Sequence, residues 1–128
     1  MYKIQDQITF TTSNVLLQMG IPYNLTGSKY LARAVDIAIH SPCAVTTITK
    51  NIYAVIALEF GTKVTNVERS IRHAVDTAWN KKKISYLNKL FGIDLYSNQY
   101  KPSNSELIAL LAERIPYLTH QYIAQGAC

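Results

Sequence analysis

Residues 65–73 combine charged and polar side chains that could recognise DNA. If this segment is an α-helix, successive residues are 100° apart around its axis. Six charged or polar residues then lie on the side opposite an apolar stripe, or at the edges of that side. They are Thr65, Asn66, Glu68, Arg69, Arg72 and His73. In a major groove, arginine can donate two hydrogen bonds to guanine and glutamate can accept one from cytosine. Thr65 and the N–H groups at the helix start suit a phosphate, which the helix dipole also attracts. The pattern therefore indicates a helix that enters a DNA groove.

An ordinary solvated helix face is the competing interpretation, with Glu68 and Arg72 forming a pair worth about 0.2–0.5 kcal/mol. The distribution of charge argues against it. Residues 61–102 hold eight basic and three acidic side chains, whereas residues 1–60 hold four and three, and residues 103–128 hold one and two. The chain of 128 residues has a formal charge of +5 and a pI near 9.3. A local cationic excess of this kind favours a polyanionic partner.

Lys81, Lys82 and Lys83 follow the same helix and allow two interpretations. A lysine run at a helix end ordinarily complements the dipole and aids solubility. Beside a reading helix, the three lysines could instead clamp phosphates, as could Lys63 at the other end. Trp79 is expected in the core and not on a base-stacking surface, because it neighbours the apolar stripe.

Motifs of catalysis and metal binding are missing from the sequence. It contains no G-x-S-x-G, no phosphate-binding glycine loop and no H-E-x-x-H. His40 and Cys43 are three apart, but no second ligand pair follows at zinc-site spacing. We therefore expect neither an enzyme nor a bound metal or cofactor.

The N-terminus resembles no secretory signal, and no stretch approaches the roughly 18 apolar residues of a membrane span. We accordingly expect a cytoplasmic chain without a membrane partner, in which Cys43 and Cys128 are free thiols.

Helical periodicity runs through nearly the whole chain. The sequence predicts helices over 6–19, from a capping Ser28 to before Pro42, over 47–60, 65–80 and 84–91, and from a capping Ser103 to Pro116. No alternating strand pattern of useful length is present. We expect an all-α, compact bundle of about six helices in one domain over residues 1–128, with its core at 6–115 and a tail at 116–128.

Two of these helices fit a helix-turn-helix. Ala57 lies four positions before Gly61, and a small side chain there allows two helices to approach at a steep angle. Val67 and Ile71 would pack the second helix onto the first. The turn from Gly61 to Val64 is expected to be longer than the tight version of this motif.

Three stretches of the chain resemble the effector domain of the stage-zero sporulation regulator A family of endospore-forming bacteria. The stretches are Ile48–Tyr53, Val67–Ala74 followed by Ala78 and Trp79, and Lys101–Glu106. The resemblance extends from about Ile8 to Ile115. It implies a response-regulator effector fold, winged-helix-like but without strands, whose helix-turn-helix binds double-stranded DNA at a TGTCGAA-type box. It also implies a homodimer on tandem sites and contact with the sigma subunit of RNA polymerase.

By position, the resemblance implies that Glu68 and Arg69 read bases and that Thr65, Arg72 and His73 hold the DNA backbone. Asn66 stands where the family usually has a basic residue that helps to read guanine. Asparagine prefers adenine, which predicts an altered box or a lower affinity. Ala54 replaces a frequent proline and predicts that two short helices merge into one.

The family's phosphoacceptor receiver domain is not in this sequence, so the chain is expected to be an excised fragment or a stand-alone relative. A second hypothesis remains open beside DNA reading. The chain could be a protein-interaction module that keeps the fold, binds RNA polymerase or a full-length regulator, and has weak or no DNA specificity.

Overall fold

The computed structural model describes residues 4–96 and 99–119, and these residues form helices and connections without a strand. In chain order the elements are α1 (Ile4–Gln18), α2 (Thr26–His40), the 3-10 helix η1 (Pro42–Thr47), the π-helix η2 (Thr49–Tyr53), α3 (Ala54–Phe60), α4 (Val64–Asn80), α5 (Tyr86–Phe91) and α6 (Asn104–Leu118). The prediction of an all-α bundle is confirmed. Within the described ranges, no helix has the length and apolarity that crossing a membrane requires.

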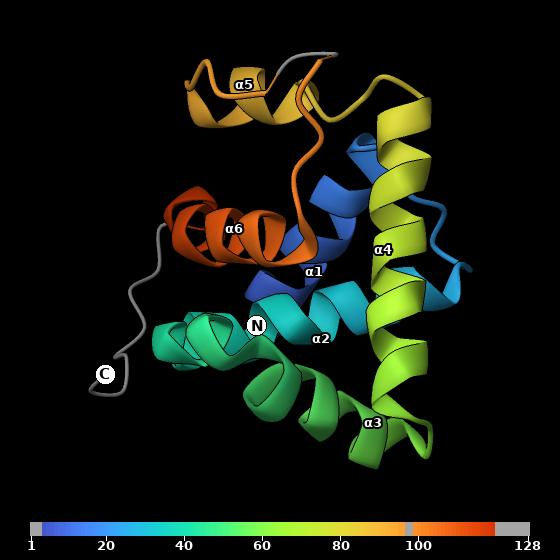
Figure 1. Ribbon diagram of the computed structural model, residues 1–128. Coiled ribbons are helices and arrows are strands. Elements are labelled where there is room, and N and C mark those ends of the chain that lie inside the picture. The colour runs from blue at the N-terminus through green and yellow to red at the C-terminus, as the bar shows by residue number, and fades with distance from the viewer. Residues whose placement is uncertain (1–3, 97–98, 120–128) are drawn as a thin grey trace.

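Helix α2 is the centre of the bundle and contacts α1, α3, α4 and α6. Its side facing the bundle is apolar and buried, at Leu31, Ala34, Val35, Ala38 and Ile39. Helix α4 stands upright along one edge of the molecule, with its start beside α3 and its end toward α5 (Figure 1). One side of α4 is therefore packed against the bundle and the other is turned outward.

Three predicted helix ends can be compared with the structure. Ser103 caps α6 as expected, because its Oγ accepts a hydrogen bond from the Glu106 N–H at 3.2 Å. The expected cap at Ser28 is wrong: α2 begins at Thr26 with Leu25 as its N-cap, and Ser28 is buried inside the helix. Pro116 does not end α6, which continues to Leu118. So close to a helix end, a proline removes a single hydrogen bond of the helix.

The segment predicted as one regular α-helix over 47–60 is mixed. A π-helix precedes α3, but the backbone stays right-handed helical at Ile48, Tyr53 and Ala54, so the merging expected from Ala54 is confirmed. Phe60, at the end of α3, is 46% exposed and packs edge-on against Tyr30 with ring centroids 5.1 Å apart.

Cys43, in η1, is disulfide-bonded. The expectation of a free thiol is therefore wrong for this residue, because the absence of a recognisable leader says nothing about which side chains the fold brings together. Cys128, the subject of the same expectation, lies outside the described residues.

Candidate nucleic-acid interface

Helices α3 and α4 are joined by a turn of three residues, Gly61 to Lys63. Gly61 adopts the left-handed conformation with φ 64°, and the Thr62 N–H donates to the Ala57 carbonyl at 2.9 Å. This bond and the glycine together form a Schellman-type helix end. The expectation of a longer turn is wrong, because α4 begins at Val64, one residue earlier than predicted. A three-residue turn containing glycine is typical of a helix-turn-helix.

The apolar side of α4 is buried as its spacing predicted. The five side chains concerned are at most 1% exposed, and they are Val67, Ile71, Ala74, Val75 and Ala78. Because this side is sealed against the bundle, the residues about 180° from it can only face away from the core.

The predicted reading residues gather on the outward side of the first half of α4. Lys63, Thr65, Asn66, Arg69, Arg72 and His73 are exposed, and Glu68 is half-buried. The Arg72 guanidinium donates to the Glu68 carboxylate at 3.0 Å, which is a pair within α4 itself. Among the described residues, Arg69 has no ion pair with another side chain. Neither guanidinium is drawn back into the bundle, so both are available to a partner.

The lysine run lies at the other end of α4, about 24 Å from Thr65 at 1.5 Å per residue. The Lys81 ammonium donates to the Gly20 carbonyl at 2.7 Å, at the end of α1. Lys82 adopts the left-handed conformation with φ 58°, and the Lys83 N–H donates to the Ala78 carbonyl at 3.1 Å. These lysines are exposed, but they end α4 and support α1, and the structure does not bring them beside Arg69 and Arg72.

A close contact between α2 and α4 was missed from the sequence. A Cβ at Gly27 would lie 2.0 Å from the Ser70 carbonyl oxygen, so only glycine allows α2 to approach the backbone of α4 at this point. A cavity of about 380 Å³ borders the contact and is lined in part by Arg69 and His73. Glycine near a predicted helix start indicates a boundary, and no local pattern distinguishes that from a packing role.

The opposite flank of α4 is bordered by the connector before α6, which was also missed. Lys101 forms an ion pair with Asp76, and the Asn104 amide donates to the Glu68 carbonyl at 3.3 Å. A second cavity, of about 360 Å³, lies here between Glu68, Arg72 and the start of α6. The capping box in the sequence places the start of α6 along the chain, but it does not indicate that α4 is the neighbour.

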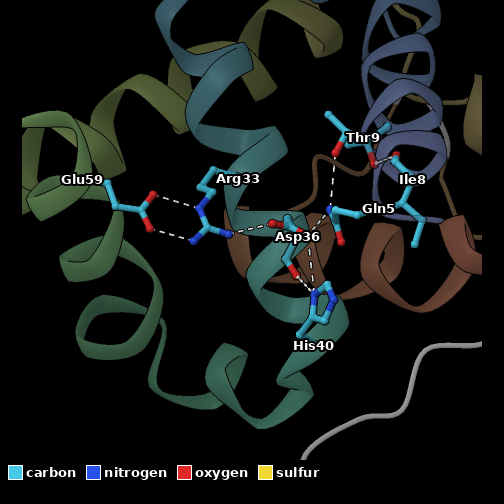
Figure 2. A network of polar contacts seen from close by, with 8 residues as sticks. Gln5, Ile8, Thr9, Arg33, Asp36, His40 and Glu59 are labelled. Atoms are coloured by element: carbon cyan, nitrogen blue, oxygen red, sulfur yellow. Dashed lines mark hydrogen bonds and ion pairs between the residues drawn. The ribbon is translucent and has the colours of Figure 1, made fainter. Parts of the chain in front are cut away.

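A polar network fixes α3 to α2 (Figure 2). The Arg33 guanidinium donates from Nε and Nη2 to the two carboxylate oxygens of Glu59, at 2.9 and 2.7 Å, and from Nη1 to Asp36 at 2.7 Å. Gln5, on α1, donates to the same Asp36 carboxylate at 2.7 Å. Hydrogen bonding from Arg33 lowers the pKa of Glu59 below its usual value. The first helix of the helix-turn-helix is therefore held by a paired guanidinium and carboxylate.

His40, weighed above as a metal ligand, is engaged differently. Its Nδ1 lies 2.9 Å from the Asp36 carbonyl oxygen one turn earlier in α2. Across residues 4–96 and 99–119, no group of three or more histidine, cysteine, aspartate or glutamate side chains is placed to hold a metal ion.

Residues 12–115 match a protein-family model described as Sporulation initiation factor Spo0A C terminal. The matched range begins within α1 and ends within α6, and it includes both helices of the helix-turn-helix together with the connector that borders α4. It also covers nearly the same range as the resemblance noted in the sequence.

Proposed function

Because this chain belongs to the sporulation initiation factor Spo0A C-terminal family, whose members are DNA-binding regulatory domains and not enzymes, we propose that it regulates transcription by reading a TGTCGAA-like box with α4. The observation that carries the proposal is the outward, cationic side of α4, which is exposed at the start of the second helix of a helix-turn-helix. A helix presented in this way fits the major groove and can meet base edges with its first turns.

The roles within the box follow from placement on α4. Asn66, Glu68 and Arg69 read base edges, whereas Lys63, Thr65, Arg72 and His73 hold phosphates. Lys82 and Lys83 contact more distant phosphates, and Lys81 adds less because its ammonium is bonded to Gly20. Asn66 donates to Thr62 at 3.1 Å in the free protein and must exchange this bond for a base.

Three further parts of the proposal rest on the family alone. Two copies occupy tandem boxes as a homodimer, the bound domain contacts the sigma subunit of RNA polymerase, and the chain works in the cytoplasm, where its DNA lies. Selecting duplexes from a random pool would identify the box and its repeat spacing, and so test the tandem arrangement directly.

Affinities measured at several salt concentrations test the reading helix. Arg72→Ala should weaken binding to all duplexes alike and should reduce the salt slope by about 0.9 for each phosphate that the arginine neutralises. Glu68→Ala or Arg69→Ala should instead reduce discrimination at one base pair, by about 1–3 kcal/mol. Arg114→Ala, which removes the same charge from α6, is the matched control and should leave discrimination unchanged.

Equal and salt-insensitive affinity of the unaltered chain for all duplexes would contradict DNA reading. That result would favour the protein-interaction module. In that case a chain with both Arg69→Ala and Arg72→Ala should still capture RNA polymerase or a full-length regulator.

A further inference from the structure

Asn104 connects three elements around the reading helix. It is the first residue of α6, where the capping of Ser103 fixes the backbone. Its amide nitrogen donates to the Glu68 carbonyl oxygen at 3.3 Å and to the Tyr53 hydroxyl at 3.1 Å. An asparagine amide carries two N–H donors, so one side chain can serve both acceptors at once. Asn104 thereby links α6 to α4 and to η2.

Tyr53 is the second acceptor of the Asn104 amide. Tyr53 is the last residue of η2, directly before α3, and it is only 4% exposed. Burial raises the pKa of its phenol, so the hydroxyl stays protonated at neutral pH. A neutral, buried hydroxyl that did not meet a partner would cost free energy, which favours keeping the Asn104 amide in place.

Glu68 is the residue of α4 to which Asn104 bonds, and Glu68 is also a proposed base reader. The bond is to the backbone carbonyl, so it acts on the position of the helix and does not engage the carboxylate, whose partner in the free protein is Arg72. The second cavity is lined by Glu68 together with residues of the connector, such as Lys101 and Pro102.

The opposite flank of α4 is held at nearly the same level. Ser70, two residues after Glu68, meets Gly27 of α2 there. At 100° per residue these two positions are about 200° apart around the helix, so the contacts grip α4 from opposite sides. Lys101, paired with Asp76, adds a third contact further along. If one of these contacts were lost, α4 could rotate about its own axis. A rotation of about 10° would move the tips of its side chains, which lie 5–6 Å from the axis, by about 1 Å.

We propose that Asn104 is a positioning residue for base reading: its amide sets the rotation of α4 and so places Glu68 against its base pair. The inference rests on the proposed function, and it assigns a role in specificity to a side chain that is not on the reading helix. Hydrogen bonds to bases weaken steeply with distance and angle, so a small rotation reduces discrimination before it reduces overall attraction to phosphates.

The test compares Asn104→Leu, which keeps the number and branching of the side-chain heavy atoms but has no donor, with the unaltered chain. Affinities are measured for the best duplex and for duplexes that carry each single base-pair change. We expect discrimination at the base pair read by Glu68 to fall about tenfold, with smaller losses at the pairs read by Asn66 and Arg69 on the same helix, and an unchanged salt slope. Asn104→Ser, whose hydroxyl cannot span both acceptors, should give the same pattern if the leucine variant does not fold.

Two further variants separate positioning from general support. Tyr53→Phe removes one acceptor but keeps the bond to Glu68, so discrimination should stay within twofold of the unaltered chain. In a Glu68→Ala background, adding Asn104→Leu should have no further effect at that base pair, because the residue through which it acts has gone.

A uniform loss of affinity over all duplexes, or an effect that adds fully to Glu68→Ala, would overturn the positioning role and leave the proposed function standing. If the unaltered chain itself prefers no duplex, the proposed function fails, and the positioning role falls with it. The two failures are distinguished by whether the unaltered chain discriminates.

Discussion

Lys82, just after α4, has a backbone conformation that residues with a Cβ seldom adopt. Its φ of 58° lies in the left-handed region, which costs roughly 1–2 kcal/mol for an L-residue other than glycine. The chain accepts this cost because the backbone must turn back at the second residue after α4, so that the Lys83 N–H can bond to the Ala78 carbonyl. Glycine usually occupies such a position.

Replacing Lys82 by glycine should therefore stabilise the protein. We expect Lys82→Gly to raise the free energy of unfolding by about 1 kcal/mol, measured by denaturant titration. Lys83→Gly removes the same charge at an ordinary φ and should not stabilise. An unchanged or lower stability of Lys82→Gly would contradict the strain assigned to Lys82.

The sequence predicted the outward residues of α4 more fully than it predicted the role of the lysine run. Helical periodicity alone separates the buried Val67 and Ile71 from the exposed Arg69 and Arg72. Three adjacent lysines, by contrast, indicate only charge. Whether Lys81 bonds to Gly20 depends on where α1 ends in space, which no spacing within 81–83 contains.

Among the elements, the contact between α2 and α4 allows the sharpest test. Gly27→Ala would place a Cβ 2.0 Å from the Ser70 carbonyl oxygen, so the two helices must separate. We expect a loss of about 2–3 kcal/mol in the free energy of unfolding, in the range of an overpacked core. Thermal unfolding followed by circular dichroism measures it.

Gly61→Ala is the control for that substitution. Gly61 has a positive φ but open space around its Cβ position, so alanine there meets strain without a clash. The expected cost is about 1 kcal/mol. Equal costs at the two glycines would show that α2 and α4 do not meet as closely as the structure indicates.

The pair between α2 and α3 predicts a dependence of stability on pH. The pKa of Glu59 in the folded protein is lowered by hydrogen bonding from Arg33. The pair therefore contributes its full stability above the usual glutamate pKa of 4.5, and this contribution is lost as the pH falls through the lowered value. Both partners are about one-third exposed, so the contribution is small, about 0.5–1 kcal/mol.

Urea titrations from pH 7 to pH 3 test this expectation. Glu59→Gln should be less stable than the unaltered chain at pH 7, and the difference should shrink as the pH falls below 4.5. Glu113→Gln is the matched control, because its ion pair among the residues that the structure describes is with its neighbour Arg114. A difference that stays constant over this range would rule out the Arg33 pair as its source.

Elements were predicted better where a local pattern decides them than where packing does. The capping box of Ser103 and Glu106 fixes its helix start by bonds within four residues. No comparable local pattern in the sequence indicates the π-helix before α3. There the tertiary contacts of the buried Ile52 and Tyr53 outweigh the regular spacing of the apolar residues.

The molecule as a whole has one core that includes residues from α1 to α6. Trp79, the single tryptophan, packs against this core beside the end of the reading helix. Because the helices share one core, we expect a single cooperative unfolding transition. Tryptophan fluorescence and far-ultraviolet circular dichroism should give the same midpoint, and separate midpoints would show that α4 unfolds independently.

At this scale the sequence predicted the fold class and the helix-turn-helix, but not the surroundings of α4. Residues 27 and 104 meet α4 on opposite flanks, although more than thirty residues separate each from its contact in the chain. Contacts between residues so far apart in the chain depend on how all the helices pack together. The sequence of one segment alone therefore does not predict them.

Holding α4 at the Glu68 carbonyl and at Ser70 has a practical consequence. Both contacts are made to the main chain of α4, whereas the side chains of Thr65, Asn66 and Arg69 are exposed and lie away from these contacts. Those three positions can therefore be randomised without disturbing the scaffold. A library built there should yield folded variants that are retargeted to new operators, with the same docking angle and altered base preferences.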